Sequence, residues 1–109
     1  MSTPFVSIVC LSFNQCKHIA QTIDSILNQR TDFNIELLIH DDASTDGTAE
    51  IIISYEKKYP QIVKAIIQEK NQFSQGKGFV GIPLCIAIAR GKYIAYCEGD
   101  DYWTDELKL

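Results

Sequence analysis

Ile35-Glu-Leu-Leu-Ile-His40 is an apolar run that stops abruptly at Asp41-Asp-Ala-Ser-Thr-Asp-Gly-Thr48, a stretch dense in turn and capping residues. Apolar runs of this length, bounded by turn signals, are typical of buried strands. Capping residues ahead of a new periodic segment indicate the start of a helix. The sequence therefore predicts a strand, a loop and then a helix over about residues 48–59, which ends before Pro60 because residues preceding proline disfavour the helical conformation.

The same alternation recurs on both sides of this stretch. Three more apolar runs predict three more strands, at Val6–Leu11, Val63–Gln68 and Tyr93–Cys97. Isoleucine and leucine recur at helical intervals over about residues 16–29, which predicts an amphipathic helix with Asn14 as its cap. A second apolar helix is expected to end at Gly91, with Pro83 either at its start or at a kink.

Four strands alternating with three helices indicate an α/β fold with a mostly parallel, Rossmann-like sheet and crossover helices. In such a sheet the carboxyl ends of all strands lie on one edge, where ligands bind. We therefore expect four loops to be neighbours in space. They are residues 12–14, 41–47, 69–78 and 98–103.

The composition narrows the class of protein. The chain has 109 residues, 46% of them hydrophobic and 22% charged, which predicts one globular domain. Its formal net charge of -4 argues against a protein that grips nucleic acid or anionic lipid. No apolar stretch approaches the roughly 18 residues of a membrane span, and no leader pattern is visible, so a cytoplasmic location is expected. The spacing of the four cysteines fits neither a redox pair nor a zinc site, which predicts reduced, mostly buried thiols.

Acidic residues gather in two of the four loops. Six of the 14 acids are there, namely Asp41, Asp42, Asp46, Glu98, Asp100 and Asp101. Carboxylates this close repel one another, and a divalent cation such as Mg²⁺ or Mn²⁺ is the simplest counterion. A metal bridging a diphosphate also stabilises the charge that develops when the diphosphate leaves. The pattern predicts group transfer from a nucleoside diphosphate. Neither a P-loop nor a dinucleotide-binding motif is present.

Three linked segments resemble glycosyltransferase family 2, whose members have the GT-A fold. They are Val6-Ser-Ile-Val-Cys-Leu-Ser-Phe-Asn14, Ile39-His-Asp-Asp-Ala-Ser-Thr-Asp-Gly-Thr48 and Gly91-Lys-Tyr-Ile-Ala-Tyr-Cys-Glu-Gly-Asp-Asp-Tyr-Trp103. The resemblance covers essentially the whole chain and stops where the family's acceptor-binding half begins. It implies that residues 1–109 are a single nucleotide-sugar-binding domain of a bacterial-type, inverting enzyme of cell-surface polysaccharide biosynthesis. The catalytic base is then expected beyond Leu109.

The resemblance also implies roles for the loop after the first strand and for its acidic neighbour. Ser12 and Phe13 are expected to lie against the nucleobase, with the Phe13 ring stacking on it, and Asn14 belongs to the same segment. Asp42 matches the carboxylate that accepts a hydrogen bond from a base N–H, which favours a UDP-linked donor.

Glu98, Gly99 and Asp100 match the DxD segment of the family. Its first acid usually contacts the ribose or the ligand, and its last acid holds the metal. Asp100 is therefore our first choice as metal ligand and the adjacent Asp101 our second. The expected nucleotide-sugar-binding residues are Ser12, Phe13, Asn14, Asp41, Asp42, Lys77, Glu98, Gly99 and Asp100.

Three positions depart from the family pattern. Leu11 replaces the usual proline, and Glu98 replaces the commoner aspartate. Ile82-Pro83 stands where the family often has an Arg-Asn pair, so Lys77, in the loop Gly76-Lys77-Gly78, is our candidate for the missing cation near phosphate.

Other interpretations stay open at this point. Asp41 and Asp42 could merely favour the start of the second predicted helix, with Ser44 or Asp46 as its cap. A non-catalytic nucleotide-binding or regulatory module is the main alternative function. A receiver-type signalling domain would need acids where Ser12-Phe13-Asn14 stands. The acceptor is expected to be a glycan, a lipid or another molecule, the full-length protein could work at the inner face of the membrane, and the truncated domain could associate with itself.

Overall fold

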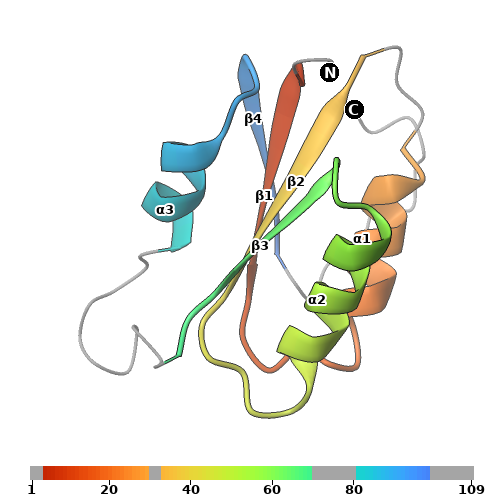
Figure 1. Cartoon of the computed structure of the whole chain (residues 1–109), viewed down its shortest axis with the longest axis vertical. Coiled ribbons are helices and arrows are strands. Elements are labelled where there is room, and N and C mark those ends of the chain that lie inside the picture. The colour runs from red at the N-terminus through yellow and green to blue at the C-terminus, as the bar shows by residue number, and fades with distance from the viewer. Residues whose placement is uncertain (1–3, 30–32, 70–80, 99–109) are drawn as a thin grey trace.

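The computed structural model describes residues 4–29, 33–69 and 81–98. Its elements, in chain order, are β1 (Val6–Ser12), α1 (Ile19–Leu27), β2 (Ile35–Asp41), α2 (Thr48–Lys58), β3 (Val63–Ile67), α3 (Gly81–Ile88) and β4 (Tyr93–Glu98). The four strands form one parallel sheet in the order β3-β2-β1-β4 (Figure 1). The predicted α/β class and parallel sheet are confirmed.

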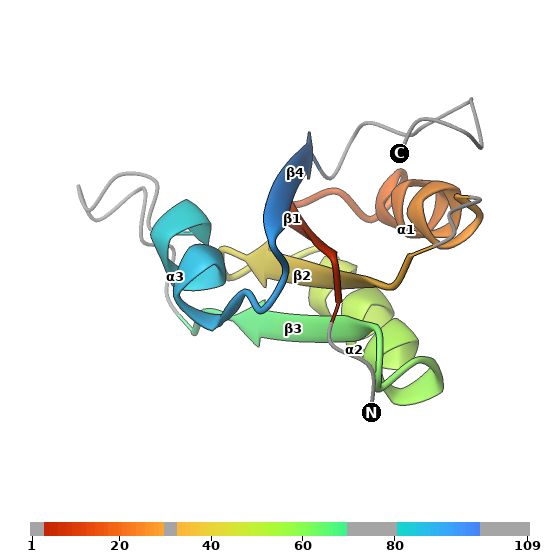
Figure 2. The same ribbon diagram turned by 90° about the horizontal axis from the view of Figure 1, so that it is seen from above.

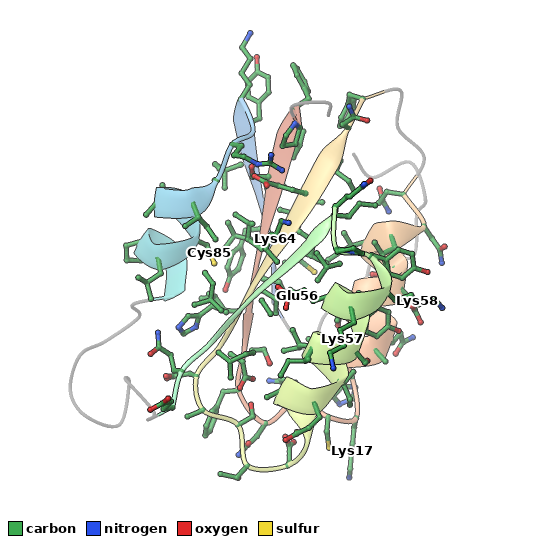
Figure 3. All side chains as sticks on the ribbon, viewed as in Figure 1. Lys17, Glu56, Lys57, Lys58, Lys64 and Cys85 are labelled. Carbon is green, nitrogen blue, oxygen red and sulfur yellow. The ribbon has the colours of Figure 1, made fainter. Side chains whose placement is uncertain are left out.

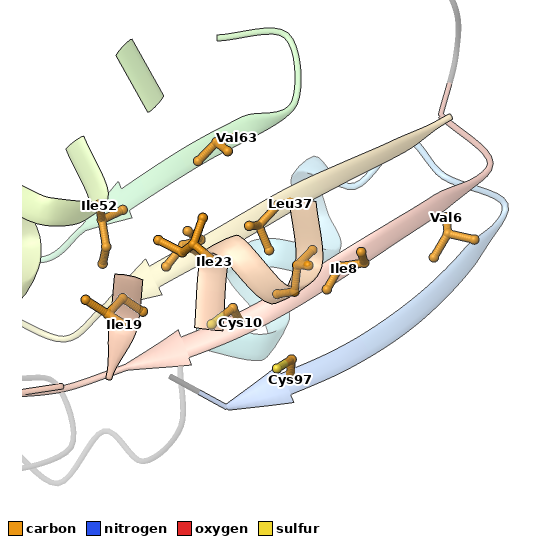
Figure 4. Packing of buried hydrophobic residues seen from close by; sticks show 11 residues of the cluster. Val6, Ile8, Cys10, Ile19, Ile23, Leu37, Ile52, Val63 and Cys97 are labelled. Carbon is orange, nitrogen blue, oxygen red and sulfur yellow. The ribbon is translucent and has the colours of Figure 1, made fainter. Parts of the chain in front are cut away.

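Helices cover both faces of the sheet, α1 and α2 on one side and α3 on the other (Figure 2). Successive residues of a strand point to opposite faces, so β1 sends Ile8 and Cys10 toward α1 and α2 while Val9 packs with Cys85 of α3. This explains why the strands read as continuous apolar runs. The larger core cluster lies between the sheet, α1 and α2 (Figure 4). Its buried members are Val6, Ile8, Cys10, Ile19, Ile23, Ile26, Leu37, Ile39, Ile52, Val63 and Cys97.

Two side chains link helices to the sheet through polar contacts. Glu56 of α2 accepts a hydrogen bond from the backbone N–H of Ala65 in β3, at 2.8 Å (Figure 3). Cys85 of α3 lies 3.9 Å from the carbonyl oxygen of Leu38 in β2, and burial raises the pKa of its thiol to about 11. All four cysteines fall within the described residues, none forms a disulfide and three are buried, so the prediction of reduced, mostly buried thiols is confirmed.

The boundaries differ from the predictions mainly at α1. This helix begins at Ile19 rather than near residue 16, and His18 occupies its N-cap position without a side-chain capping bond. The prediction that Asn14 caps α1 is wrong. Asn14 stands four residues earlier, in the left-handed conformation with φ of 51°, and bonds elsewhere, as described below. The predicted end of α3 differs as well, because the helix stops at Ile88 and not at Gly91.

Pro83 is the third residue of α3, where a missing N–H costs no helical hydrogen bond. Of the two predicted places for Pro83, the start of the helix and a kink, its position in the described α3 agrees with the first. Among the described helices, none combines the length and the apolar character needed to cross a bilayer.

A buried carboxylate anchors the amino edge of the sheet. Glu36 of β2 is 1% exposed and accepts hydrogen bonds from the Ser7 hydroxyl at 2.6 Å, from the Arg90 backbone N–H at 2.7 Å and from Arg90 Nε at 3.3 Å. The Ser7 hydroxyl oxygen accepts in turn from the N–H of Gly91, at 2.8 Å. Burial raises the pKa of Glu36, but the bonds from Arg90 and Ser7 outweigh it and leave the pKa below its ordinary value. This cluster joins the start of β4 to β1 and β2.

Candidate functional site

The carboxyl ends of three strands lie side by side. In the register of the sheet, Ser12 of β1 pairs with Asp41 of β2, and Leu11 of β1 pairs with Glu98 of β4. The residues that follow β1 and β2 therefore leave the sheet at one edge, as predicted, and Glu98 brings the end of β4 to the same edge. Gly99, Asp100, Asp101 and Lys77 lie outside the described residues, so the predictions that concern them stay predictions.

The loops that follow β1 and β2 are joined directly to each other. The backbone N–H of Asp42 donates to the carbonyl oxygen of Ser12 at 3.0 Å. The backbone N–H of Asn14 donates to the hydroxyl oxygen of Ser44 at 2.8 Å, and the side-chain oxygen of Asn14 accepts from the Thr45 N–H at 2.8 Å. The two loops therefore form one unit, held by contacts between residues about thirty positions apart.

Asp41 stabilises this pair of joined loops through hydrogen bonds. Its side chain is fully buried and accepts hydrogen bonds from the Ser12 hydroxyl at 3.0 Å, from the Ser44 N–H at 2.9 Å and from the Ser44 hydroxyl. Both carboxylate oxygens are thus engaged within the protein. Of the two adjacent acids, only Asp42, which is half-buried, keeps a surface that a ligand could contact.

Asp46 takes part in a second set of contacts between the loops. It accepts from the Cys16 N–H at 3.2 Å, from the Thr48 N–H at 3.2 Å and from the Thr48 hydroxyl. The hydrogen bond from the Thr48 hydroxyl is the main reason that the pKa of Asp46 falls to about 2. Gly47, with φ of 95°, occupies the N-cap position of α2 and has no side chain to offer. Neither Ser44 nor Asp46 is therefore the N-cap residue of α2, but the Asp46 carboxylate, one residue before the N-cap, still accepts from the first amide of the helix and also from Cys16.

Phe13 is an exposed aromatic side chain among the described residues at this edge. It is 44% exposed, and it stands between Ser12, which is buried, and Asn14, whose backbone is left-handed. On the other loop Ala43 also has a positive φ, 61°. Such angles are uncommon for residues with a Cβ and persist only where surrounding contacts enforce them. The tight turn presents the Phe13 ring outward.

His40 lies under the edge, on the α3 side of β2. It is 3% exposed, and its Nε2 lies 3.3 Å from the side-chain nitrogen of Gln68, just past the end of β3. Burial lowers the pKa of His40, and the nearby carboxylates of Asp42 and Asp41 only partly offset this effect. The ring is therefore neutral near pH 7, so Nε2 accepts a hydrogen bond from Gln68 when Nδ1 carries the proton.

The sequence interpretation missed residues that hold the loops together. They are Ser44, Thr45 and Thr48, which the sequence indicates only as turn and capping residues, and Gln15, for which it indicates no role. The signal available was the density of hydroxyl residues after Asp42, because serine and threonine side chains readily bond to nearby backbone groups.

Among the residues that the structure describes, no group of three or more histidine, cysteine or acidic side chains is arranged to hold a metal ion. The predicted metal ligands, Asp100 and Asp101, follow β4 beyond the last described residue. The described part of the edge therefore consists of an exposed aromatic ring, a half-buried carboxylate and two joined loops.

Comparison with known proteins gives relatives along almost the entire chain. It is 45% identical over 104 residues to an uncharacterized protein of Mycobacterium tuberculosis, covering 95% of this chain and 29% of that protein. It is 40% identical over 100 residues to the Escherichia coli UDP-Glc:alpha-D-GlcNAc-diphosphoundecaprenol beta-1,3-glucosyltransferase WfaP, covering 91% and 36%. The chain thus spans about a third of the length of these curated relatives.

Solved structures share the fold. S. aureus TarS 1-349 in complex with UDP-GlcNAc matches with a TM-score of 0.74 and 26% identity, over 90% of this chain and 27% of that one. A mannosyltransferase from Pyrobaculum calidifontis, in complex with GDP-Man and Mn²⁺, matches with a TM-score of 0.77 over 97% of this chain and 30% of that one. At 19% identity the second likeness shows the fold alone.

The family model described as Glycosyl transferase family 2 matches residues 7–109, which include every described helix and strand except the first residue of β1. That range contains the joined loops and the Glu98 end of β4. The chain belongs to glycosyltransferase family 2.

Proposed function

We propose that this chain is the donor-binding domain of an enzyme that transfers a sugar from a nucleoside diphosphate sugar, UDP-linked, to an acceptor. The observation that carries the proposal is the pair of joined loops after β1 and β2, which presents an exposed Phe13 and a half-buried Asp42 at the carboxyl edge of a parallel sheet. Ligands of open parallel sheets bind at this edge. Membership of glycosyltransferase family 2 gives the reaction class.

The nucleobase site consists of Phe13 and Asp42. The Phe13 ring offers a face on which a base can stack, and the Asp42 carboxylate offers an acceptor for a base N–H. Uracil carries such an N–H beside two carbonyl groups, which fits one acidic acceptor. The UDP complexes of S. aureus TarS, at 26% identity, support a uridine donor in a related protein.

Three further residues support the same site through contacts within the protein, namely Ser12, Asn14 and Asp41. The Ser12 hydroxyl donates to Asp41, and the Asn14 side chain accepts from Thr45, so their polar groups serve the protein itself. We assign all three to holding the base-binding turn, and of them only Asn14, which is exposed, has surface that could also meet the nucleotide.

The diphosphate site is assigned to the residues at and after the end of β4. We assign Glu98 to the ribose, and Asp100, with Asp101 as second choice, would hold a Mn²⁺ or Mg²⁺ ion; Gly99 belongs to the same nucleotide-sugar-binding segment. Lys77 is the proposed cation beside phosphate. Carboxylate oxygens are the ligands that these hard cations prefer, and β4 lies next to β1, the strand that leads into the proposed base site. When bound, the ion neutralises charge on the departing diphosphate.

The transfer step inverts the anomeric carbon in this proposal. An acceptor hydroxyl forms the new glycosidic bond on the face opposite the diphosphate, which leaves with the bonding electron pair while a base takes the hydroxyl proton. We assign no residue of this chain as that base and expect it beyond Leu109. The chain alone should therefore bind donor without efficient transfer.

The acceptor and the cellular location are proposed from the relatives alone. We propose a glycan or lipid-linked acceptor of cell-surface polysaccharide biosynthesis, with the enzyme acting in the cytoplasm at the inner face of the membrane. The name of WfaP describes a lipid-linked acceptor for that protein, which is 40% identical over the matched residues.

Isothermal titration with UDP in the presence of Mn²⁺ tests the proposal. We expect binding of UDP, weaker binding of CDP and GDP because their bases present different edges to Asp42, and weaker UDP binding when the ion is removed. A folded protein that gives no heat at millimolar UDP contradicts the donor assignment. Binding that is indifferent to Mn²⁺ contradicts the metal assignment alone.

A further inference from the structure

Thr48 is a fully buried residue at the start of α2 whose hydroxyl connects the two loops. Its Oγ1 accepts a hydrogen bond from the backbone N–H of Gln15 at 2.9 Å, and its hydroxyl donates to the carboxylate of Asp46. One hydroxyl group thus receives from the segment after β1 and donates to the loop after β2. Since the residue has no exposed surface, it cannot touch a bound nucleotide.

Two consecutive amides of the first loop are held in this way. Gln15 donates to Thr48, and Cys16 donates to Asp46 at 3.2 Å. The carbonyl oxygen of Gln15 in turn accepts from the N–H groups of His18 and Ile19, at 2.9 and 2.8 Å, and the His18 side chain makes no capping bond. The start of α1 is therefore fixed by residues of the other loop and not by a cap of its own.

The turn that carries Phe13 is held at both ends. On one side Ser12 is fixed by its place in the sheet and by its bond to Asp41. On the other side Gln15 is fixed by Thr48. Loss of the second attachment leaves the turn tied to β1, to Ser44 and Thr45 through Asn14, and to Asp46 through the more distant Cys16.

We propose that Thr48 is a positioning residue for nucleotide binding, which acts through Gln15 to hold the Phe13 turn in its binding conformation. This inference rests on the proposed function, because it assumes that Phe13 contacts the nucleobase. An ordered turn pays no ordering cost when the ligand arrives, whereas a released turn must be ordered again at the expense of affinity.

The chemistry of the side chain separates this role from simple packing. Valine has nearly the shape of threonine but no hydroxyl, so in Thr48→Val the Gln15 N–H loses its acceptor and Asp46 loses a donor. A buried N–H group without an acceptor destabilises the conformation in which it is buried. The turn is then expected to shift to conformations in which the Gln15 N–H is hydrated. Serine keeps the hydroxyl and loses only a methyl group, so Thr48→Ser is expected to retain both hydrogen bonds.

The experiment compares four variants, Thr48→Val, Thr48→Ser, Asp46→Asn and the control Thr22→Val, which makes the same change at a fully buried threonine within α1. For each we measure UDP affinity with Mn²⁺, the melting temperature, and the exchange rates of the Gln15 and Cys16 amides by NMR. Thr48→Val is expected to weaken UDP binding by about tenfold, consistent with loss of one buried hydrogen bond, and to speed exchange at Gln15. Thr48→Ser and Thr22→Val should bind as the wild type does.

Asp46→Asn keeps the test valid if Thr48→Val does not fold, because Asp46 is exposed and its replacement leaves the core intact. It should weaken binding and speed exchange at Cys16. Unchanged affinity in the folded Thr48→Val or Asp46→Asn protein overturns the inference, whatever happens to the melting temperature. If the wild type itself does not bind UDP, the proposed function falls. In that case the amide exchange alone tests whether Thr48 holds Gln15. Faster exchange at Gln15 in Thr48→Val supports this contact, and unchanged exchange overturns it.

Discussion

The backbone N–H of Asp42 donates to the carbonyl oxygen of Ser12, at 3.0 Å, one residue after β2 has ended. This bond extends the pairing of β1 and β2 past the sheet and sets where the Asp42 side chain leaves the backbone. The proposed acceptor for the base is thus placed by the strand that also carries Phe13. The two contacts that we propose with the base, through Phe13 and Asp42, thus belong to a single structural unit.

Replacement of Phe13 by alanine should weaken UDP binding by roughly tenfold, because stacking of a base on an aromatic ring contributes about 1–3 kcal/mol. Phe13→Tyr should retain affinity, since it keeps the ring. The melting temperature should change little, because the side chain is 44% exposed. Phe5→Ala is a matched control, since Phe5 is 41% exposed at the opposite edge and packs against Phe33 and Tyr93. Equal affinities for Phe13→Ala and the wild type, measured by titration calorimetry, would contradict the stacking role.

The adjacent aspartates should respond differently to the same change. Asp42→Asn is expected to lower UDP affinity and leave stability almost unchanged, because Asp42 is half-buried at the surface of the site. Asp41→Asn should lower the free energy of unfolding by about 1–3 kcal/mol, since it disturbs a buried carboxylate that accepts from Ser12 and Ser44. Urea denaturation and calorimetry distinguish the two effects. The assignment is wrong if Asp42→Asn destabilises the fold and Asp41→Asn does not.

Stability should fall in acid through Glu36. Its pKa in the folded protein lies below the ordinary value of 4.5, so the unfolded chain takes up a proton first. The stabilisation is complete above about pH 4.5 and is lost as the pH falls below it, through the folded-state pKa. Melting temperatures measured from pH 7 to pH 3 should drop less steeply in Glu36→Gln than in the wild type. The variant should already have a lower melting temperature at pH 7. The variant Glu50→Gln, on exposed α2 surface, is the control and should follow the wild type.

Gly91→Ala should be more destabilising than Gly47→Ala. A Cβ on Gly91 would lie 2.6 Å from both the backbone nitrogen and the hydroxyl oxygen of Ser7, and 2.8 Å from the backbone of Val6, so β1 and β4 must separate. We expect a loss of about 1–3 kcal/mol, as for other overpacked positions. Gly47 has open space around it, with Glu50 at 4.0 Å, and its cost is the positive φ alone. Similar unfolding free energies for the two variants in urea would show that the close approach of Gly91 to Ser7 does not matter.

Self-association of the isolated chain is expected through the exposed apolar side chains of α3 and β4. They are Leu84, Ile86, Ile88, Tyr93, Ile94 and Tyr96, each between 39% and 53% exposed. Ile86→Glu should shift the protein toward monomer in light scattering behind gel filtration, because it places a charge within this surface. Ile53→Glu, on the exposed side of α2, should leave the association unchanged. A wild-type protein that is monomeric at high concentration refutes the expectation.

The strands could be predicted because each is an apolar run placed between two helical layers, as Val6–Ser12 and Ile35–Asp41 are. Their shared edge followed from the topology. The error at Asn14 has a physical cause. A local cap on α1 and a distant bond to Thr45 compete for the same side-chain oxygen, and tertiary contact favours the distant bond.

The detailed contacts of the site could not be predicted in the same way. Which hydroxyl meets which amide between Gln15 and Thr48 depends on how two loops meet, and no periodicity in the sequence encodes that meeting. The receiver-type alternative does not hold, since the chain belongs to glycosyltransferase family 2.

The buried Glu36 cluster with Arg90 stands at one end of the strands, and the turn of Phe13 stands at the other. Substitutions at the two ends share no partner, so their effects on folding should add rather than interact. An engineer could therefore stabilise the Glu36 end first and then vary the turn of Phe13, which we propose binds the base. Changes that stabilise the fold and changes intended to alter donor preference could then be made in separate steps.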